Sequence, residues 1–415
     1  MIVLQKYRAG CYLAARCHYE YREYQEALDV LDQSENSFLS WKVSTSTSSQ
    51  DDLPYSIPSK NIDSSVNLLR GKIYEALENR NLASECFREA LRGDVFCYEA
   101  FESLINHHMM TAQEERDLLD SLPFSSQCSG SEIQLLKFLY GNKLKKYSKP
   151  GSIQISEDIQ QLSSNNDVIV SLAENHYYNC DFRQAYKIAS DVLKSDPYNF
   201  QCLPLYIVIL VELKNSNELF ALAHKLVDMY PNKAVSWFAT GCYYLLVGKN
   251  DPARRYLSKA TSVDRVFGPA WLAFGHSFAT ENEHDQAMAA YFTASQLMKG
   301  CHLPVLYIGL EYGLTNNAKL AERFFGQALS IAPEDPFVLH EMGVVAFKNQ
   351  DYAEAEKCFT NALQKIESVS HEVMVDKWEP LLNNLGHVCR KLKWVVENIN
   401  NFVMKRVLGG RTVIS

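Results

Sequence analysis

One stretch of the sequence comes close to a nucleophile motif. Residues 275–279 read Gly-His-Ser-Phe-Ala, one residue away from the G-x-S-x-G turn that presents a reactive serine. That turn needs a strand before the serine, whereas Gly275 occupies a repeated position that glycine also holds at residues 241 and 309. We therefore interpret Gly275 as a helix-packing residue and expect no catalytic residue here.

Two other stretches begin like a zinc-binding H-E-x-x-H helix. His-Glu pairs stand at residues 340–341 and 371–372, but Val344 and Val375 hold the closing positions. Valine has no atom that can bind a metal, so neither stretch supplies a second ligand. The sequence predicts no zinc site of this kind.

The remaining candidate motifs also lack the required geometry. Gly248 and the lysine after it are followed by Asn250 and not by Ser or Thr, so this stretch is a turn and not a phosphate loop. Soft ligands gather at residues 107–110 and 301–302, but neighbours on a helix point about 100° apart and do not converge. We expect no metal, no cofactor and no enzymatic activity.

Composition favours a folded, largely helical protein. The 415 residues include only 18 glycines and 13 prolines, and 47% are hydrophobic. Their net charge of −8 gives no reason to expect a nucleic-acid partner. The apolar run at residues 203–211 is far shorter than the roughly 20 residues of a membrane span. Eleven cysteines without a C-x-x-C pair favour a reducing compartment.

A period of 34 residues organises the second half of the chain. Small residues recur at this spacing in two series, Gly241, Gly275, Gly309, Gly343 and Ala253, Ala287, Ala321, Ala355. Large residues recur between them, including Trp237, Trp271 and Tyr312. Small residues allow two helices to approach and large ones fill the space opposite, so each unit is predicted to be a helical hairpin stacked on its neighbours.

The period predicts an all-α superhelix of antiparallel helix pairs. One unit, residues 200–233, is degenerate because Leu219 and Leu226 replace its small residues. The predicted segments are a degenerate repeat at 1–39, a flexible insertion at 40–63, repeats and an extra helix at 64–147, a flexible joint at 148–165, six contiguous repeats at 166–369, and a partial repeat with a divergent tail at 379–415.

The first helices of successive repeats are predicted to line an apolar groove for an extended or helical peptide. A clamp for a C-terminal carboxylate needs Lys and Asn at their fifth and ninth positions, and these are absent. The alternative is that Phe238, Leu272 and Leu306 only pack between helices. The candidate groove residues are Phe238, Cys242, Leu272, His276, Leu306, Tyr307, Leu310, Phe337, His340, Phe347, Asn383, Asn384 and His387.

The order of bulky and small residues resembles the tetratricopeptide repeat. Segments 236–239, 268–271, 284–292, 306–312 and 379–386 further resemble the Cdc-sixteen-type subunit family of the anaphase-promoting complex. This resemblance implies a non-catalytic scaffold of a cell-cycle ubiquitin ligase that promotes degradation of mitotic regulators. It implies other tetratricopeptide subunits as partners and a small stabilising subunit in the groove. It also implies a nuclear and cytoplasmic location, with centrosome and spindle.

The sequence departs from this family at both ends. The family begins with further repeats that mediate homodimerisation, so we do not expect a homodimer from this chain. At the other end, Asn398 and Lys405 stand where small residues should recur. Two alternatives stay open: a tetratricopeptide co-chaperone or adaptor of another assembly, and a remnant of a repeat-bearing enzyme.

Overall fold

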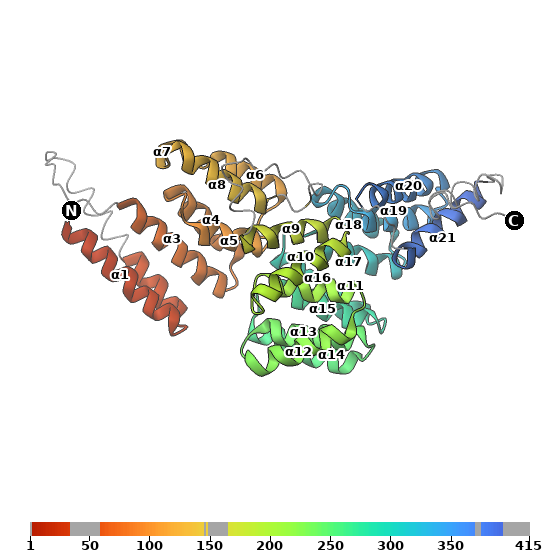
Figure 1. Ribbon diagram of the computed structural model, residues 1–415, viewed down its shortest axis with the longest axis horizontal. Helices are drawn as coiled ribbons and strands as arrows, with labels where there is room; N and C mark the ends of the chain where they lie inside the picture. Colours follow the sequence, from red (N-terminus) through yellow and green to blue (C-terminus); the bar gives the residue numbers. More distant parts are fainter. Residues whose placement is uncertain (1, 34–58, 145–146, 148–164, 370–374, 393–415) are drawn as a thin grey trace. The chain divides into compact units, whose positions relative to one another are not determined.

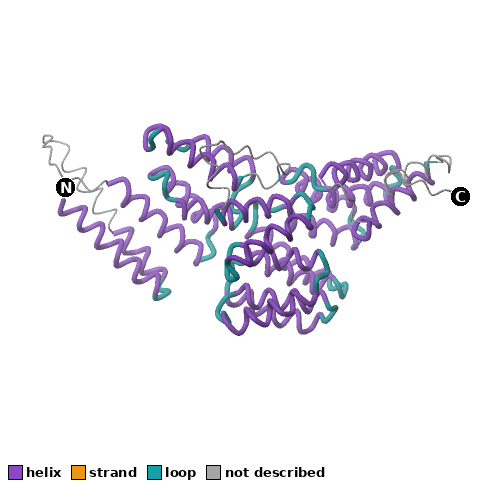
Figure 2. The backbone as a smooth tube through the Cα atoms, viewed as in Figure 1, coloured by secondary structure: helices purple, strands orange, loops and turns teal. Residues whose placement is uncertain are grey.

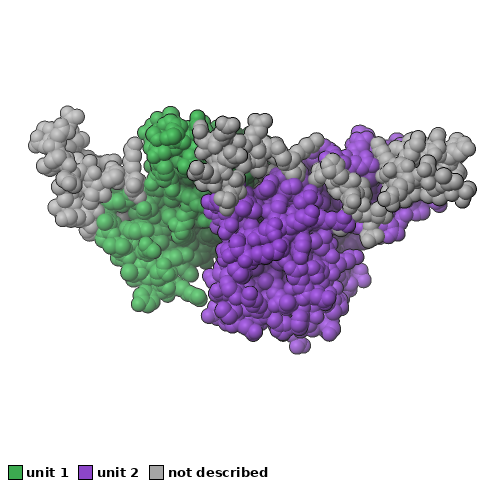
Figure 3. Space-filling view, viewed as in Figure 1, with its two compact units in different colours: residues 1–144 green, residues 145–415 purple. Residues whose placement is uncertain are grey.

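The structure, a computed structural model, describes residues 2–33, 59–144, 147, 165–369 and 375–392. Within these residues every regular element is a helix and no strand occurs, as Figure 2 shows. The predicted all-α helix-pair architecture is therefore confirmed. The chain divides into two compact units, residues 1–144 and 145–415, which Figure 3 distinguishes by colour.

Unit 1 consists of helix pairs followed by shorter helices (Figure 1). Residues 24–33 are helical and follow the first labelled helix. The labelled helices are α1 (Ile2–Glu20), α3 (Ser59–Ala76), α4 (Arg80–Gly93), α5 (Tyr98–Asn106), α6 (Ala112–Ser121), α7 (Phe124–Gln127) and α8 (Gly130–Lys143). The predicted joint at 148–165 falls almost wholly outside the described residues, as do residues 393–415 of the predicted tail.

Unit 2 contains six consecutive helix pairs and one further helix. The pairs are α9 (Asn166–Tyr178) with α10 (Phe182–Ser195), α11 (Cys202–Glu212) with α12 (Ser216–Met229), α13 (Ala234–Leu246) with α14 (Asn250–Val263), α15 (Gly268–Ala279) with α16 (His284–Leu297), α17 (His302–Leu314) with α18 (Ala318–Ile331), and α19 (Pro336–Lys348) with α20 (Tyr352–Val369). The last helix is α21 (Val375–Lys391).

The turn between the two helices of each pair has one conformation throughout unit 2. A residue with positive φ recurs every 34 positions, with φ between 56° and 77°, at Cys180, Lys214, Gly248, Asn282, Asn316 and Gln350. This left-handed conformation stops the first helix and reverses the chain. Only one of the six is glycine, so the backbone geometry is preserved even where the residue type does not favour it.

Two predicted boundaries are wrong. The insertion predicted for 40–63 ends earlier, because α3 begins at Ser59 and Ile62 packs against the core formed with α1. The C-terminal repeat predicted from 379 begins at Val375. Pro380 lies within α21, and the buried Trp378, two residues before it, packs in the core that α21 forms with α20.

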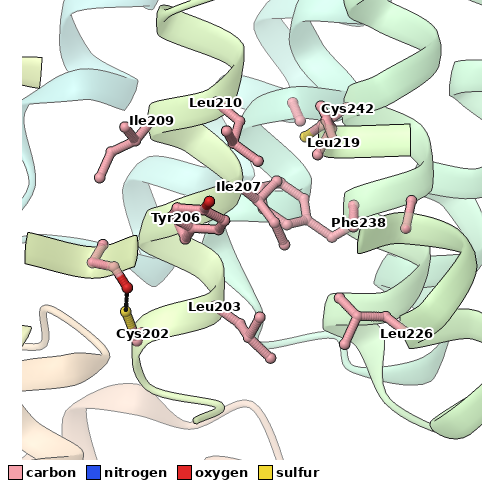
Figure 4. Packing of buried hydrophobic residues seen from close by; sticks show 14 of the residues in the cluster. Cys202, Leu203, Tyr206, Ile207, Ile209, Leu210, Leu219, Leu226, Phe238 and Cys242 are labelled. Atoms are coloured by element: carbon pink, nitrogen blue, oxygen red, sulfur yellow. Dashed lines mark hydrogen bonds between the residues drawn. The ribbon is translucent and has the colours of Figure 1, made fainter. Parts of the chain in front are cut away.

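The degenerate repeat, residues 200–233, keeps the helix-pair fold although its large and small side chains occupy different positions. Ile207 stands where the next four repeats have glycine, and Ala223, sixteen residues later, stands where those four have a large side chain. Both are buried in the largest core of unit 2. Leu219 and Leu226 join them there, and Figure 4 shows Ile207 and Leu219 close to Phe238 of the next repeat.

Candidate partner-binding surface

The small and large residues of the period face each other within the helix pairs. A Cβ atom placed on Gly309 would lie 2.6 Å from the ring of Phe325, closer than real carbon atoms approach. The same obstruction occurs at three other glycines and their partners on the second helix, namely Gly241 with Leu257, Gly275 with Tyr291, and Gly343 with Phe359. These contacts fix the distance and rotation between the helices of a pair.

The other repeat-packing residues also lie at helix joints. The indole Nε1 of Trp237 donates to the carbonyl of Pro231 (2.7 Å), and that of Trp271 donates to Arg265 (2.8 Å). The ring of Tyr312 stacks on Phe324, with centroids 5.4 Å apart. The alanine side chains on the second helices are fully buried, at Ala253, Ala287, Ala321 and Ala355. The first helices are therefore held in a defined orientation.

Three predicted groove residues lie in the core and cannot line an open surface. The exposed fractions of Phe238, Cys242 and Leu306 are 1%, 5% and 3%. Phe238 and Cys242 pack with the leucines of α12, as Figure 4 shows, and Leu306 packs with α18 and α19. For these positions the alternative holds: the side chains fill the space between helices.

The rings of His276 on α15 and Tyr307 on α17 are half-buried, and they pack on Tyr291 of α16, which is fully buried. Nδ1 of His276 lies 2.7 Å from the hydroxyl of Tyr291, and its ring centroid lies 4.3 Å from that of Tyr307. Tyr291 and Tyr307 stack with centroids 5.5 Å apart. Leu272 packs beside them. This cluster combines apolar faces with polar edges, the chemistry that binds peptide segments.

Burial controls the protonation of this cluster. It lowers the pKa of His276 to about 4, so the imidazole is neutral at physiological pH. Burial also raises the pKa of Tyr307, and the carboxylates of Glu212 and Asp335 add to that rise. Tyr307 therefore lies near charges from α11 and from the start of α19, and the cluster itself carries no charge.

A second group joins α19 to α21. The side chain of Asn384 donates to Nε2 of His340 (3.0 Å), so Nδ1 carries the proton and donates to Glu341 (2.8 Å). Asn383 and His387 are exposed, and the structure does not bring them into this group.

The other half-buried groove candidates pack on separate neighbours. Leu310 contacts the core between α17 and α19, and the ring of Phe337 packs at a tilt against Trp378, with centroids 4.5 Å apart. The ring of Phe347 lies 5.4 Å from that of Tyr352. We call Leu272, His276, Tyr307, Leu310, Phe337 and His340 the inner set.

Sequence reasoning missed a contact between distant helices. The ammonium of Lys377, at the start of α21, forms an ion pair with Glu212 at the end of α11. It also lies 3.8 Å from the ring centroid of Phe182 and 5.3 Å from that of Phe337. No local spacing signals this contact, because 165 residues separate the two charges.

The motifs that suggested chemistry have structural roles. Ser277 is fully buried and its hydroxyl donates to the carbonyl of Phe274 (2.6 Å), so it is not presented as a nucleophile. His302 is buried, and its Nε2 lies 3.1 Å from the carboxylate of Asp335. Across the described ranges, no three His, Cys, Asp or Glu side chains gather as a metal site would require. Nor does any helix there combine the length and apolar character of a membrane span.

Comparison with known proteins places these features in a family. Residues 64–92 match the tetratricopeptide repeat model. The chain is 61% identical to the mouse cell division cycle protein 16 homolog over 95% of its own length and 64% of that protein. It is 38% identical to the Arabidopsis thaliana anaphase-promoting complex subunit 6, covering 92% of this chain and 72% of the relative.

A solved structure has the same fold. The APC/C hetero-tetramer Cut9-Hcn1 contains a chain that superposes with a TM-score of 0.78 at 35% identity, over 98% of this chain and 74% of that one. The chain spans just under two thirds of the length of its mouse relative.

Proposed function

The chain belongs to the family of anaphase-promoting complex subunit 6 and cell division cycle protein 16 homologs, and from this premise we propose that it is a non-catalytic scaffold of that ubiquitin ligase. In this role it supports ubiquitin-dependent degradation of mitotic regulators by holding other subunits. The observation that carries the proposal is the neutral, half-buried aromatic surface of the inner set on a family-typical helix-pair array.

We assign the inner set to a segment of a small partner subunit. The related Cut9 was crystallised with Hcn1 in a hetero-tetramer, and the same family fold is present here. The rings of His276 and Tyr307 offer apolar faces and hydrogen-bonding edges at low conformational-entropy cost, as aromatic binding surfaces do. We also propose that other tetratricopeptide subunits dock elsewhere on the chain, and that the protein is nuclear and cytoplasmic, with centrosome and spindle.

The test is binding of a fluorescently labelled Hcn1-type subunit to the full chain. Leu310→Asp places a charge among the inner set and is expected to weaken binding at least about tenfold, because a carboxylate beside apolar surface is costly to desolvate. The matched control is Val263→Asp, which changes an exposed residue at the end of α14. Equal affinity of wild type and Leu310→Asp, with helicity unchanged, would refute the assignment.

A further inference from the structure

Unit 2 is closed by contacts between its first and last repeats. Each helix from α9 to α21 packs on the next one in order, as expected of a solenoid. Lys377 adds a contact that this order does not supply, because it joins α21 to Phe182 of α10 and Glu212 of α11. The first and last described repeats of unit 2 are therefore in contact, and we call this closed arrangement of repeats the ring of unit 2.

Two further contacts support this closure. Cys180, in the turn between α9 and α10, packs against the core formed by α20 and α21. Tyr178, at the end of α9, packs against the core around Met298 and Cys301. The first repeat of the unit thus touches its later repeats at two places besides Lys377.

The environment of Lys377 is suited to a specific contact. Its side chain is 15% exposed, and that of Glu212 is 31% exposed. The ammonium has an aromatic ring on two sides and a carboxylate as counter-charge, which compensates for the water that it loses. Phe337, one of the two rings, also belongs to the inner set, so the closure adjoins the surface assigned to the partner segment.

We propose that Lys377 is a latch that closes the ring of unit 2 and limits the rate at which a partner segment enters and leaves. The inference rests on the function proposed above. A segment inside a closed ring must be threaded from one end, or the ring must open first. The latch is present in both the free and the occupied protein, so its removal changes rates more than affinity.

The experiment measures association and dissociation of a fluorescently labelled Hcn1-type subunit by stopped-flow anisotropy. Lys377→Ala is expected to raise both rate constants about tenfold or more while Kd changes less than about threefold. Lys377→Arg, which keeps the charge and stacks on aromatic rings, is expected to restore slow exchange. The matched control is Lys365→Ala, because Lys365 also pairs with a glutamate, Glu334, but between two adjacent repeats.

Each outcome distinguishes the latch from the underlying function. If the labelled subunit fails to bind wild type, the proposed function is overturned. If it binds and Lys377→Ala exchanges at the wild-type rate, the latch is overturned. A weaker Kd with an unchanged association rate also overturns it, since Lys377 is then a direct binding residue. Glu212→Gln removes only the counter-charge and provides the same test if Lys377→Ala loses helicity.

Discussion

At the scale of single residues, glycine and its partner sixteen positions later determine how four consecutive helix pairs of unit 2 pack, from α13 to α20. The pairing follows from sequence spacing alone, because a missing side chain on one helix must be matched by volume on the other. The structure brings Gly309 against Phe325 and Gly343 against Phe359 with no room for a Cβ atom. This part of the architecture was predictable from the residue types.

Gly309→Ala should destabilise the protein by about 1–3 kcal/mol, because the added methyl group meets the ring of Phe325. Gly326→Ala is the matched control: Gly326 lies in α18 of the same repeat and has open space around it. It should stabilise by up to about 1 kcal/mol through helix propensity. Amide hydrogen exchange of α17 and α18 measures both, and equal effects of the two substitutions would contradict the packing account.

His276 should make stability depend on pH. Its pKa is lowered to about 4 from an ordinary value of 6.5, so the unfolded chain binds the proton more readily between these values. The stabilisation that comes from the buried, neutral imidazole is complete above pH 6.5. It is lost as the pH falls towards 4, by up to about 3 kcal/mol. His276→Gln removes this dependence. Urea unfolding at several pH values gives the free energy of unfolding of both proteins. An identical dependence of this free energy on pH would show that the imidazole is not buried in the folded state.

At the scale of elements, the turns keep one backbone conformation even where the residue type does not favour it. The left-handed residue recurs at the same position in each pair of unit 2, yet only Gly248, Asn282 and Asn316 are of types that readily adopt this conformation. Lys214→Gly should therefore stabilise unit 2 by about 0.5–1 kcal/mol, and Gly248→Ala should destabilise it by about 1 kcal/mol. Urea midpoints measure both changes. Destabilisation by Lys214→Gly would mean that the lysine side chain has a stabilising role that outweighs the strained backbone.

Element boundaries were less predictable than element types. The C-terminal repeat was predicted from residue 379, but α21 begins at Val375 and includes the buried Trp378. The identity of inner-surface residues was also uncertain from sequence. Phe238 and Leu306 have the periodicity of a lining position, but the closeness of neighbouring repeats buries them. The spacing of residues in the sequence predicts which face of a helix a side chain lies on, but it does not predict how closely the next helix packs on that face. A core residue and a residue that lines a surface therefore have the same periodicity.

At the scale of the whole unit, closure between the first and last repeats depends on contacts that no local pattern encodes. In an open solenoid each repeat contacts only its neighbours, so the two ends open independently. Lys377 connects α21 to α10 and α11, and its removal should therefore destabilise helices that are distant in sequence. We expect Lys377→Ala to increase amide exchange in α9 and α10 at least about fivefold, although these helices are far from it in sequence.

The matched comparison uses Lys365→Ala, whose ion pair with Glu334 joins two adjacent repeats. Its effect should stay within α18 to α20, because loss of a local contact spreads only to adjacent repeats. The two variants remove the same kind of charge pair, so a difference in where exchange increases reports connectivity and not charge. If Lys377→Ala also affects only α20 and α21, unit 2 behaves as an open array. The partner segment would then reach the inner set from the side, without a latch to open.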